Sequence, residues 1–398
     1  MQLHNRKSLS KAMLIALSLM VTVLMGNQCP LGLNPVAVAE LQAAGVDKYL
    51  GEFTPVSSEL QPNGWVKHVF DTDGGNGPIC IVGSPFTSFT KAGNPSKLLI
   101  FLNGGGACWQ NFYFCTPFAE EDLGAAEDAP GIFADSFDTG HSIINNPFAD
   151  WSMMFVSYCD GSVFSGDNDV VDPNYPFGPV RFHRGLRNIS ASMDLAKATF
   201  PNAREIMVAG ASAGGVGATA FTPFLARMLY GNTVRLTVFN DAGPIAVNTD
   251  PLLLPAFIAR RDDWQFDQFY PESCTDCDPL GQATALVKWR LDNDSTIRES
   301  FYSTDGDATN RFFLAVPTQE AYRAIIVPEH DALNAAHPTR YKSFIRSGDD
   351  EHTALGLDTF YLGTANGVPL WEWTRDFVKG QGNSPGWQHI VEDFVPIL

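Results

Sequence analysis

The stretch Glu205-Ile-Met-Val-Ala-Gly-Ala-Ser-Ala-Gly-Gly215 decides the fold. Its first five residues predict a buried strand, and the small residues after Ser212 suit the start of a helix. A sharp strand-to-helix turn around a serine requires small neighbours, and here they are glycine and alanine. The pattern predicts a nucleophile elbow with Ser212 as the nucleophile. The alternative is a glycine-rich turn that binds a phosphate or has no chemical role.

Short apolar runs predict the other strands of the same sheet. The expected strands are 98–102, 153–158, 205–209, 236–240, 285–291 and 342–346. Residues 186–200 have apolar side chains at helical spacing, and 215–229 predict a helix in which Pro223 marks a kink or a delayed start. Apolar strands that alternate with helices predict an α/β fold, with a mainly parallel sheet covered by helices on both faces. Residues 114–151 and 244–281 are expected to form insertions of loops or short helices around the site.

The beginning of the chain predicts an export signal. Three basic residues precede the apolar run 12–25, and Ala37-Val-Ala39 offers a cleavage site before Glu40. The run has 14 residues, fewer than the ~20 that a membrane-spanning helix needs, so no stable membrane anchor is expected. The sequence therefore predicts a signal peptide over residues 1–39, a single domain over residues 40–398, and a secreted or periplasmic protein.

Charge and cysteine content restrict the partners and the compartment. The formal net charge is −18, and removal of the three basic residues of the signal makes it about −21. Such a surface repels nucleic acid and anionic membranes, so no nucleic-acid partner is expected. Cleavage would also remove Cys29 and leave six cysteines, an even number that predicts three disulfides in an exported chain.

A serine nucleophile needs a histidine to take its proton and a carboxylate to orient that histidine. With a nucleophile elbow, the acid and then the histidine follow the serine along the chain. The histidines after Ser212 are His330, His337, His352 and His389. His352 is the best placed, because it follows the predicted strand 342–346 through a short turn. His330 and His337 are expected at the surface.

The position of the acid stays open on spacing alone. Asp241 follows the predicted strand 236–240, while Asp292 and Asp294 follow the predicted strand 285–291. Each is also consistent with a helix cap or a turn.

Donors for an oxyanion are predicted in the glycine loop after strand 98–102. Consecutive glycines at Gly104, Gly105 and Gly106 let backbone N–H groups approach a substrate, and the N–H of Ala213 follows the nucleophile. The alternatives are a flexible turn or a dinucleotide loop, but the loop lacks the G-x-G-x-x-G spacing of the latter.

Several motifs together resemble the pectin acetylesterase/Notum family. They are Leu102-Asn-Gly-Gly-Gly-Ala-Cys-Trp109, Tyr158-Cys-Asp-Gly-Ser162 with Phe164-Ser-Gly-Asp167, Phe182-His-Arg-Gly185, Gly210-Ala-Ser-Ala-Gly-Gly215, Asp241-Ala-Gly243 and Asp294-Ser295. The resemblance extends from about Cys80 to about His352. It implies a secreted, single-domain α/β-hydrolase that cleaves carboxylic esters without a metal or a cofactor.

The resemblance also implies roles for individual residues. Ser212 becomes the nucleophile, His352 the general base and Asp294 the acid, which leaves Asp241 a structural or site-lining residue. Gly104, Gly105, Gly106 and Ala213 match the oxyanion region. The implied disulfides are Cys80–Cys159, Cys108–Cys115 and Cys274–Cys277.

The family pattern is not matched everywhere. Plant members have cysteine where Ala211 and Thr353 stand, and Notum-like members have a bulky aromatic residue where Gly106-Ala107 stands. The expected reaction is removal of acetyl groups from an acylated polysaccharide such as pectin. The protein is expected to be a monomer. Arg184 and Arg187 are candidate basic residues in the cleft. A lipid, polyester or long-acyl ester is the alternative substrate, and a non-catalytic binding protein is the alternative function.

Overall fold

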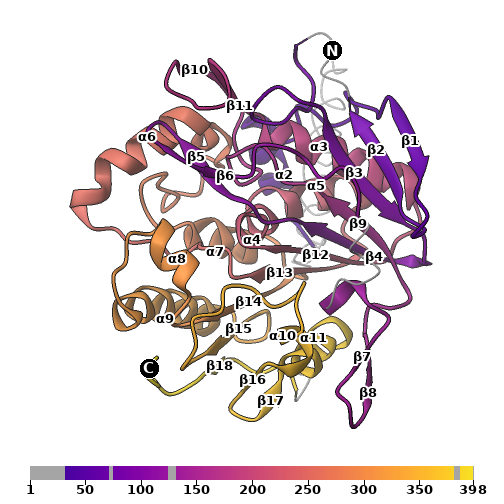
Figure 1. Ribbon diagram of the computed structural model, residues 1–398, viewed down its shortest axis with the longest axis vertical. Coiled ribbons are helices and arrows are strands. Elements are labelled where there is room, and N and C mark those ends of the chain that lie inside the picture. Colours follow the sequence, from indigo (N-terminus) through magenta and orange to yellow (C-terminus); the bar gives the residue numbers. More distant parts are fainter. Residues whose placement is uncertain (1–31, 71–74, 124–130, 381–385, 398) are drawn as a thin grey trace, which may run out of the picture.

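Ten strands form one large sheet that runs through the molecule (Figure 1). The computed structural model describes residues 32–70, 75–123, 131–380 and 386–397. In spatial order the strands are β1 (Ser57–Leu60), β2 (Val66–Phe70), β3 (Phe86–Lys91), β9 (Trp151–Val156), β4 (Asn94–Leu102), β12 (Glu205–Ala211), β13 (Arg235–Asp241), β14 (Arg298–Thr304), β15 (Tyr341–Arg346) and β18 (Ile390–Val391). The strands from β9 to β18 are parallel, and β1, β2 and β3 extend the sheet in antiparallel order.

Both faces of the sheet are buried, as β4 illustrates. Leu98, Ile100 and Leu102 point into one hydrophobic core, whereas Leu99 and Phe101 point into a second core on the other face. Alternate side chains of a strand lie on opposite faces, so an apolar run of this kind indicates a strand covered on both sides. The prediction of a mainly parallel sheet in an α/β fold is confirmed.

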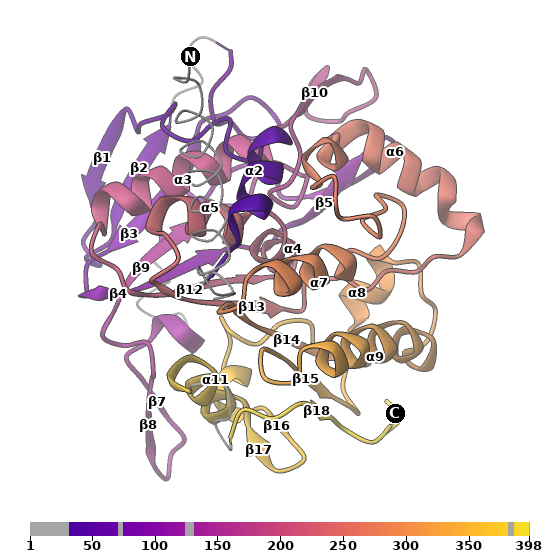
Figure 2. The ribbon, with the colours of Figure 1, turned by 180° about the vertical axis from the view of Figure 1, so that it is seen from behind.

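Helices cover the two faces unequally (Figure 2). The first core contains side chains of α2 (Pro35–Ala43), α3 (Gly185–Thr199), α5 (Thr222–Tyr230), α7 (Thr284–Asn293) and α9 (Gln319–Ala336). The second contains side chains of η2 (Gly131–Phe133), α10 (Thr359–Leu362) and α11 (Leu370–Lys379). Within the described residues, no helix is long and apolar enough to cross a membrane.

The predicted helix 215–229 is divided in two. It consists of α4 (Ala213–Thr219) and α5, and Pro223 stands in the first turn of α5. Proline is tolerated there because the N–H groups of the first turn have no acceptor within the helix. The delayed start that the sequence allowed is therefore the one that occurs.

The predicted strand 285–291 is wrong, because these residues belong to helix α7. Leu286, Val287, Arg290 and Leu291 are buried, and positions separated by three and four residues share one face of a helix. A seven-residue apolar run does not distinguish a strand from a buried helix. The strand in this part of the sheet is β14, which starts at Arg298 and which the sequence did not reveal.

The two predicted insertions contain short helices, as the sequence allowed, and also a hairpin that it did not predict. Residues 114–151 contain hairpin β7 (Ser136–Asp138) and β8 (Ile143–Asn145), and 244–281 contain α6 (Leu254–Trp264), η3 (Pro251–Leu253) and η4 (Phe266–Phe269). The remaining elements are β5 (Gly106–Trp109), β6 (Phe112–Cys115), β10 (Asn168–Val171), β11 (Val180–His183), β16 (Thr364–Ala365), β17 (Val368–Pro369) and α8 (Ala308–Phe313).

The beginning of the folded unit differs from the predicted boundary at residue 39. Leu33 and Ala37 are buried, the side chain of Asn34 accepts the N–H of Ala37, and the N–H of Asn34 donates to the carbonyl of Asn293. Cleavage after Ala39 would cut through helix α2. Residues 32–39 therefore belong to the fold, because they bury apolar side chains and cap a helix. Residues 1–31, which contain most of the predicted signal peptide, lie outside the described residues.

Candidate active site

Ser212 occupies a strained turn between β12 and α4. Its backbone has φ 57° and ψ −121°, a conformation that residues other than glycine rarely adopt. Gly210 and Gly214 make the turn possible, because a Cβ on Gly210 would lie 2.1 Å from the carbonyl oxygen of Gly214. This is the geometry of a nucleophile elbow.

His352 lies in the loop after β15, and its partner is Asp307. The Nδ1 of His352 is 2.7 Å from Oδ2 of Asp307. The Nε2 of His352 is buried and has no hydrogen-bond partner within the described part of the chain. Because Nδ1 faces a carboxylate, the neutral ring carries its proton there and leaves Nε2 as an acceptor.

Asp307 is held at the start of α8. It is buried, and its Oδ1 accepts the N–H of Asn310 at 2.7 Å. Burial raises the pKa of the Asp307 carboxyl, while the hydrogen bond from His352 and the charge of that ring oppose the rise. Asp307 is absent from the predicted residues because the neighbouring strand was predicted too early in the chain. The signal that could have revealed it is the Asp305-Gly-Asp307 turn directly after β14.

The prediction that Asp294 orients His352 is wrong. Asp294 accepts hydrogen bonds from the guanidinium of Arg227, with 2.6 Å between Nε and Oδ2. It precedes β14, whereas Asp307 follows it. The seven residues of β14 span about 20 Å. The two carboxylates therefore lie at opposite ends of this strand, Asp294 at its amino end and Asp307 at its carboxyl end.

Ser212, His352 and Asp307 follow the carboxyl ends of parallel strands. Their strands, β12, β15 and β14, belong to the consecutive set from β12 to β15. In parallel sheets this edge is where ligands bind. The fold thus brings the predicted nucleophile, the predicted base and a carboxylate to the same end of one sheet.

The predicted oxyanion residues lie beside Ser212. A Cβ on Gly104 would be 3.0 Å from Cβ of Ser212, and Gly106 and Ala213 line the same pocket as the serine. Ala213 is the first residue of α4, so its N–H has no acceptor within the helix. Gly105 lies next to the ring of Tyr158, where a Cβ would come within 2.3 Å. No larger residue fits in this loop.

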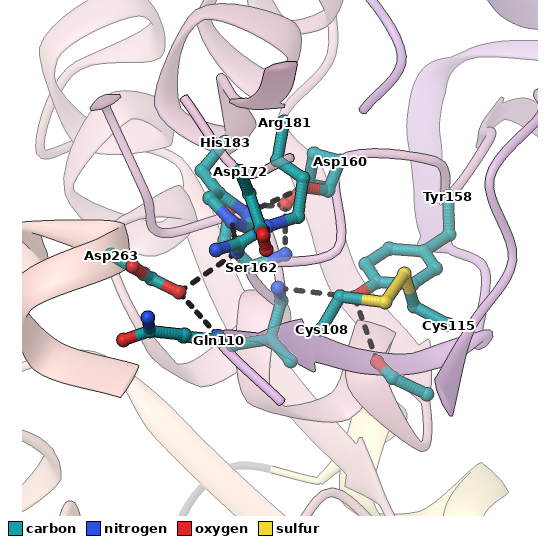
Figure 3. The surroundings of a disulfide bond; sticks show 12 residues. Cys108, Gln110, Cys115, Tyr158, Asp160, Ser162, Asp172, Arg181, His183 and Asp263 are labelled. Atoms are coloured by element: carbon teal, nitrogen blue, oxygen red, sulfur yellow. Dashed lines mark hydrogen bonds and ion pairs between the residues drawn. A yellow bond between two sulfur atoms is a disulfide. The ribbon is translucent and has the colours of Figure 1, made fainter. Parts of the chain in front are cut away.

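A disulfide fixes the hairpin of β5 and β6 that begins at Gly106 (Figure 3). Cys108 and Cys115 are joined, the Tyr158 hydroxyl donates to the carbonyl of Gly106 at 2.7 Å, and the N–H of Gln110 donates to Asp263. The hairpin is therefore anchored at its first strand, at its turn and across its base.

A buried arginine is linked to the same hairpin through Asp263, which also accepts the N–H of Gln110 (Figure 3). Arg181 pairs with Asp172 at 3.0 Å and with Asp263 at 2.8 Å, and it donates to Nε2 of His183. An arginine can only donate, so His183 accepts at Nε2 and its Nδ1–H faces the carbonyl of Asp160. Burial, followed by the charge of Arg181, lowers the pKa of His183 to about 3.

A largely apolar pocket of about 130 Å³ opens beside Ser212. Its wall includes Trp109, Val216, Ala220, Phe221, Ile245, Val247, Trp264, Phe266, Leu286 and Phe313. These side chains come from β5, α4, the α4–α5 junction, the segment 244–281, α7 and α8. The predicted insertion 244–281 therefore walls the site.

Two other predicted features have different outcomes. The three disulfides are those that the resemblance implied, Cys80–Cys159, Cys108–Cys115 and Cys274–Cys277. Arg184 and Arg187, in contrast, do not line the pocket: they are buried in ion pairs with Asp169 and Asp167.

Within the described residues, no group of His, Cys, Asp or Glu side chains is placed to hold a metal ion.

The mainly parallel sheet and the strained serine at its edge define the α/β-hydrolase class of fold. Residues 66–253 match the family model described as pectinacetylesterase. This match agrees with the family that the sequence motifs resemble.

Curated relatives come from Arabidopsis thaliana. Pectin acetylesterase 11 is 30% identical over 172 residues, which are 42% of each chain. Pectin acetylesterase 7 is 28% identical over 42% of each chain. Pectin acetylesterase 4 is 30% identical over 35% of this chain and 34% of the length of that relative. The chain thus matches less than half the length of these relatives.

Proposed function

We propose that this chain is a secreted serine carboxylic ester hydrolase that forms an acyl-enzyme on Ser212. The observation that carries the proposal is the pairing of His352 with Asp307 at the edge of the sheet where Ser212 is held in its strained turn. Acyl transfer by a serine requires a nucleophile, a base that takes its proton and a carboxylate that orients the base.

In the proposed reaction, Nε2 of His352 takes the hydroxyl proton of Ser212 while the serine oxygen attacks the ester carbonyl. Asp307 keeps the Nδ1–H in place and stabilises the imidazolium. The N–H groups of the glycine loop and of Ala213 hold the oxyanion. The tetrahedral intermediate collapses, and His352 returns the proton to the departing alkoxide. Water then attacks the acyl-serine in the same way, which releases the acid and restores Ser212.

For the substrate we propose the O-acetyl groups of a polysaccharide. The names of the Arabidopsis relatives support this choice. The formal charge of −18 and the burial of Arg184 and Arg187 in ion pairs favour a polymer with few free carboxylates.

One observation favours a longer acyl group as the second candidate. The pocket beside Ser212 is largely apolar and, at about 130 Å³, could hold several water molecules at roughly 10–15 Å³ each. The methyl group of an acetyl ester needs far less room. An acyl chain of several carbons would bury its surface there, at about 0.8 kcal/mol per methylene.

The first test is hydrolysis of p-nitrophenyl esters from acetate to octanoate, followed by release of acetate from acetylated pectin. Activity that is highest on acetate, with acetate released from the polymer, supports deacetylation. A preference for octanoate with no release from the polymer supports the second candidate. Ser212→Ala should abolish turnover and labelling by a fluorophosphonate probe. Full activity in this variant would contradict the mechanism, and failure of the native protein to react would favour a non-catalytic binding protein.

Export is part of the proposal. Three disulfides are expected in an oxidising compartment rather than in a reducing cytosol. The protein should be recovered outside the cytoplasm, as a monomer by light scattering, with these six cysteines oxidised. Free thiols at these positions in the active protein would contradict export.

A further inference from the structure

Asp241 is a buried carboxylate that the proposed mechanism does not use. It is the last residue of β13 and has no exposed surface. Within the described part of the chain, no lysine or arginine forms an ion pair with it. Burial of an ionised carboxylate is costly unless hydrogen bonds or a cation compensate it. Its hydrogen-bond donors within the described residues are backbone N–H groups, which makes the position of those groups informative.

The donors to Asp241 belong to the loop that carries the histidine. The N–H of Ala354 lies 3.0 Å from Oδ1 and 3.1 Å from Oδ2, and the N–H of Leu355 donates to Oδ2 at 2.8 Å. These residues follow His352 by two and three positions. The carboxylate therefore fixes the backbone immediately after His352.

The backbone of the same residue holds the nucleophile. The N–H of Ser212 donates to the carbonyl oxygen of Asp241 at 2.8 Å. One residue further on, the carbonyl of Ala242 accepts from the side chain of Asn310 at 2.9 Å, and the N–H of Asn310 donates to Oδ1 of Asp307. The end of β13 thus contacts the segments that carry the serine, the histidine and the acid.

We infer that Asp241, as a carboxylate, is a positioning residue that sets His352 against Ser212. This inference rests on the proposed function. Asp241 does not touch the reacting atoms, because its carboxylate faces the backbone of the histidine loop. Replacement of Oδ2 by a donor would remove the acceptor of the Leu355 N–H and leave the Ala354 N–H with Oδ1 alone. Misplacement of a base by about 1 Å can cost about 100-fold in rate.

The ionisation of Asp241 is expected to matter near neutral pH. Burial raises its pKa to about 7, opposed by the N–H groups of Leu355 and Ala354 and by the charge of His352. The other titratable groups that act on it are Asp307 and, on β14, Tyr302. Below its pKa, the Asp241 carboxyl group is protonated, and its hydroxyl oxygen is a weaker acceptor for the N–H groups of Ala354 and Leu355.

The test compares Asp241→Asn with Asp294→Asn. Both residues are buried carboxylates, but Asp294 is bonded to Arg227 at the other edge of the sheet. The kcat per active site, titrated with a fluorophosphonate, should fall about 10- to 100-fold in Asp241→Asn with KM within about twofold. In Asp294→Asn it should stay within about twofold of the native value. A kcat unchanged in Asp241→Asn, or reduced equally in both variants, would overturn the inference.

A second measurement is decided by the native protein, and Asp241→Asn supplies a comparison where it folds. If kcat requires both a neutral His352 and an ionised Asp241, log kcat of the native protein on the acidic side should approach a slope of two, and in Asp241→Asn a slope of one. A native slope of one would overturn the requirement for the carboxylate. Full activity of Ser212→Ala would instead contradict the proposed function itself, so the two failures can be distinguished.

Discussion

Nδ1 of His352 and Oδ2 of Asp307 lie 2.7 Å apart, although 45 residues separate them in the chain. The two residues meet because β14 and β15 are neighbouring parallel strands and each residue follows the carboxyl end of its strand. The N-terminal turn of α8 holds Asp307 through Asn310. A fixed carboxylate of this kind selects the histidine tautomer that can act as a base at Nε2.

The first prediction concerns Asp307→Asn. The amide removes the acceptor that holds the Nδ1–H, so kcat for p-nitrophenyl acetate should fall by roughly 10³- to 10⁴-fold. Folding should be retained, because the amide oxygen can still accept the N–H of Asn310. A kcat within about tenfold of the native value, with His352→Ala inactive, would show that Asp307 is not the acid.

The second prediction concerns Asp294→Ala. This change leaves the buried guanidinium of Arg227 without its carboxylate, and loss of one partner of a buried pair costs about 3–5 kcal/mol. We expect a lower urea midpoint but an unchanged kcat for the protein that remains folded. If the midpoint were unchanged and kcat fell a thousandfold, the assignment of Asp294 to a structural ion pair would have to be abandoned.

The strands of the sheet were easier to predict from the sequence than the carboxylate that pairs with His352. The sequence of β14 explains the difference. The apolar runs of β4, β9, β12, β13 and β15 are buried on both faces and stand out in the sequence. The sequence of β14, Arg-Glu-Ser-Phe-Tyr-Ser-Thr, looks like an exposed segment. Its Glu299 is buried only because Arg290 of α7 pairs with it at 2.7 Å, and a partner nine residues away is not evident from composition.

The misplaced strand made Asp294 one of the candidate acids, and the family resemblance then selected it over Asp241. With the strand placed at 285–291, Asp294 followed its carboxyl end, whereas it actually precedes β14. Ser212 and His352 were placed correctly at strand ends because their strands have clear apolar signals. His330 was expected at the surface, but it is buried in α9 and stacks on Phe301. Its helix contains Pro328, which suggested a loop.

The third prediction uses the pocket. Ala220 lines it, and a phenyl ring in Ala220→Phe would occupy the space of an extended acyl chain. We expect kcat/KM to fall about tenfold or more for p-nitrophenyl octanoate and less than about threefold for acetate. Ala336→Phe, at an exposed position near the end of α9, is the control and should change neither. An equal loss for both esters in Ala220→Phe would mean that the pocket does not hold the acyl chain.

The fourth prediction concerns the start of the folded unit. A chain that begins at Glu40 lacks the buried Leu33 and the Asn34 cap of α2, which together contribute about 3 kcal/mol. Its urea midpoint should lie below that of a chain that begins at Gly32. Mass spectrometry of the exported protein should give an N-terminus at or before Gly32. An N-terminus at Glu40 in a fully stable protein would contradict the role of residues 32–39.

The fifth prediction is loss of stability in acid through His183 and His330. Burial is the main cause that lowers the pKa of each to about 3. In the unfolded chain both histidines take up protons below about pH 6.5, while the folded protein keeps them neutral. This contribution to stability is therefore complete above pH 6.5 and is lost as the pH falls towards 3, by about 2 kcal/mol per histidine at pH 5.

His330→Phe tests this prediction, because it keeps a ring against Phe301 but cannot be protonated. It removes an acceptor or donor for Tyr341, 2.6 Å away, which costs about 1 kcal/mol at every pH. The difference in unfolding free energy between pH 7 and pH 5 should therefore be about 2 kcal/mol smaller in His330→Phe than in the native protein. An identical difference in both proteins would show that His330 is not held neutral by the fold.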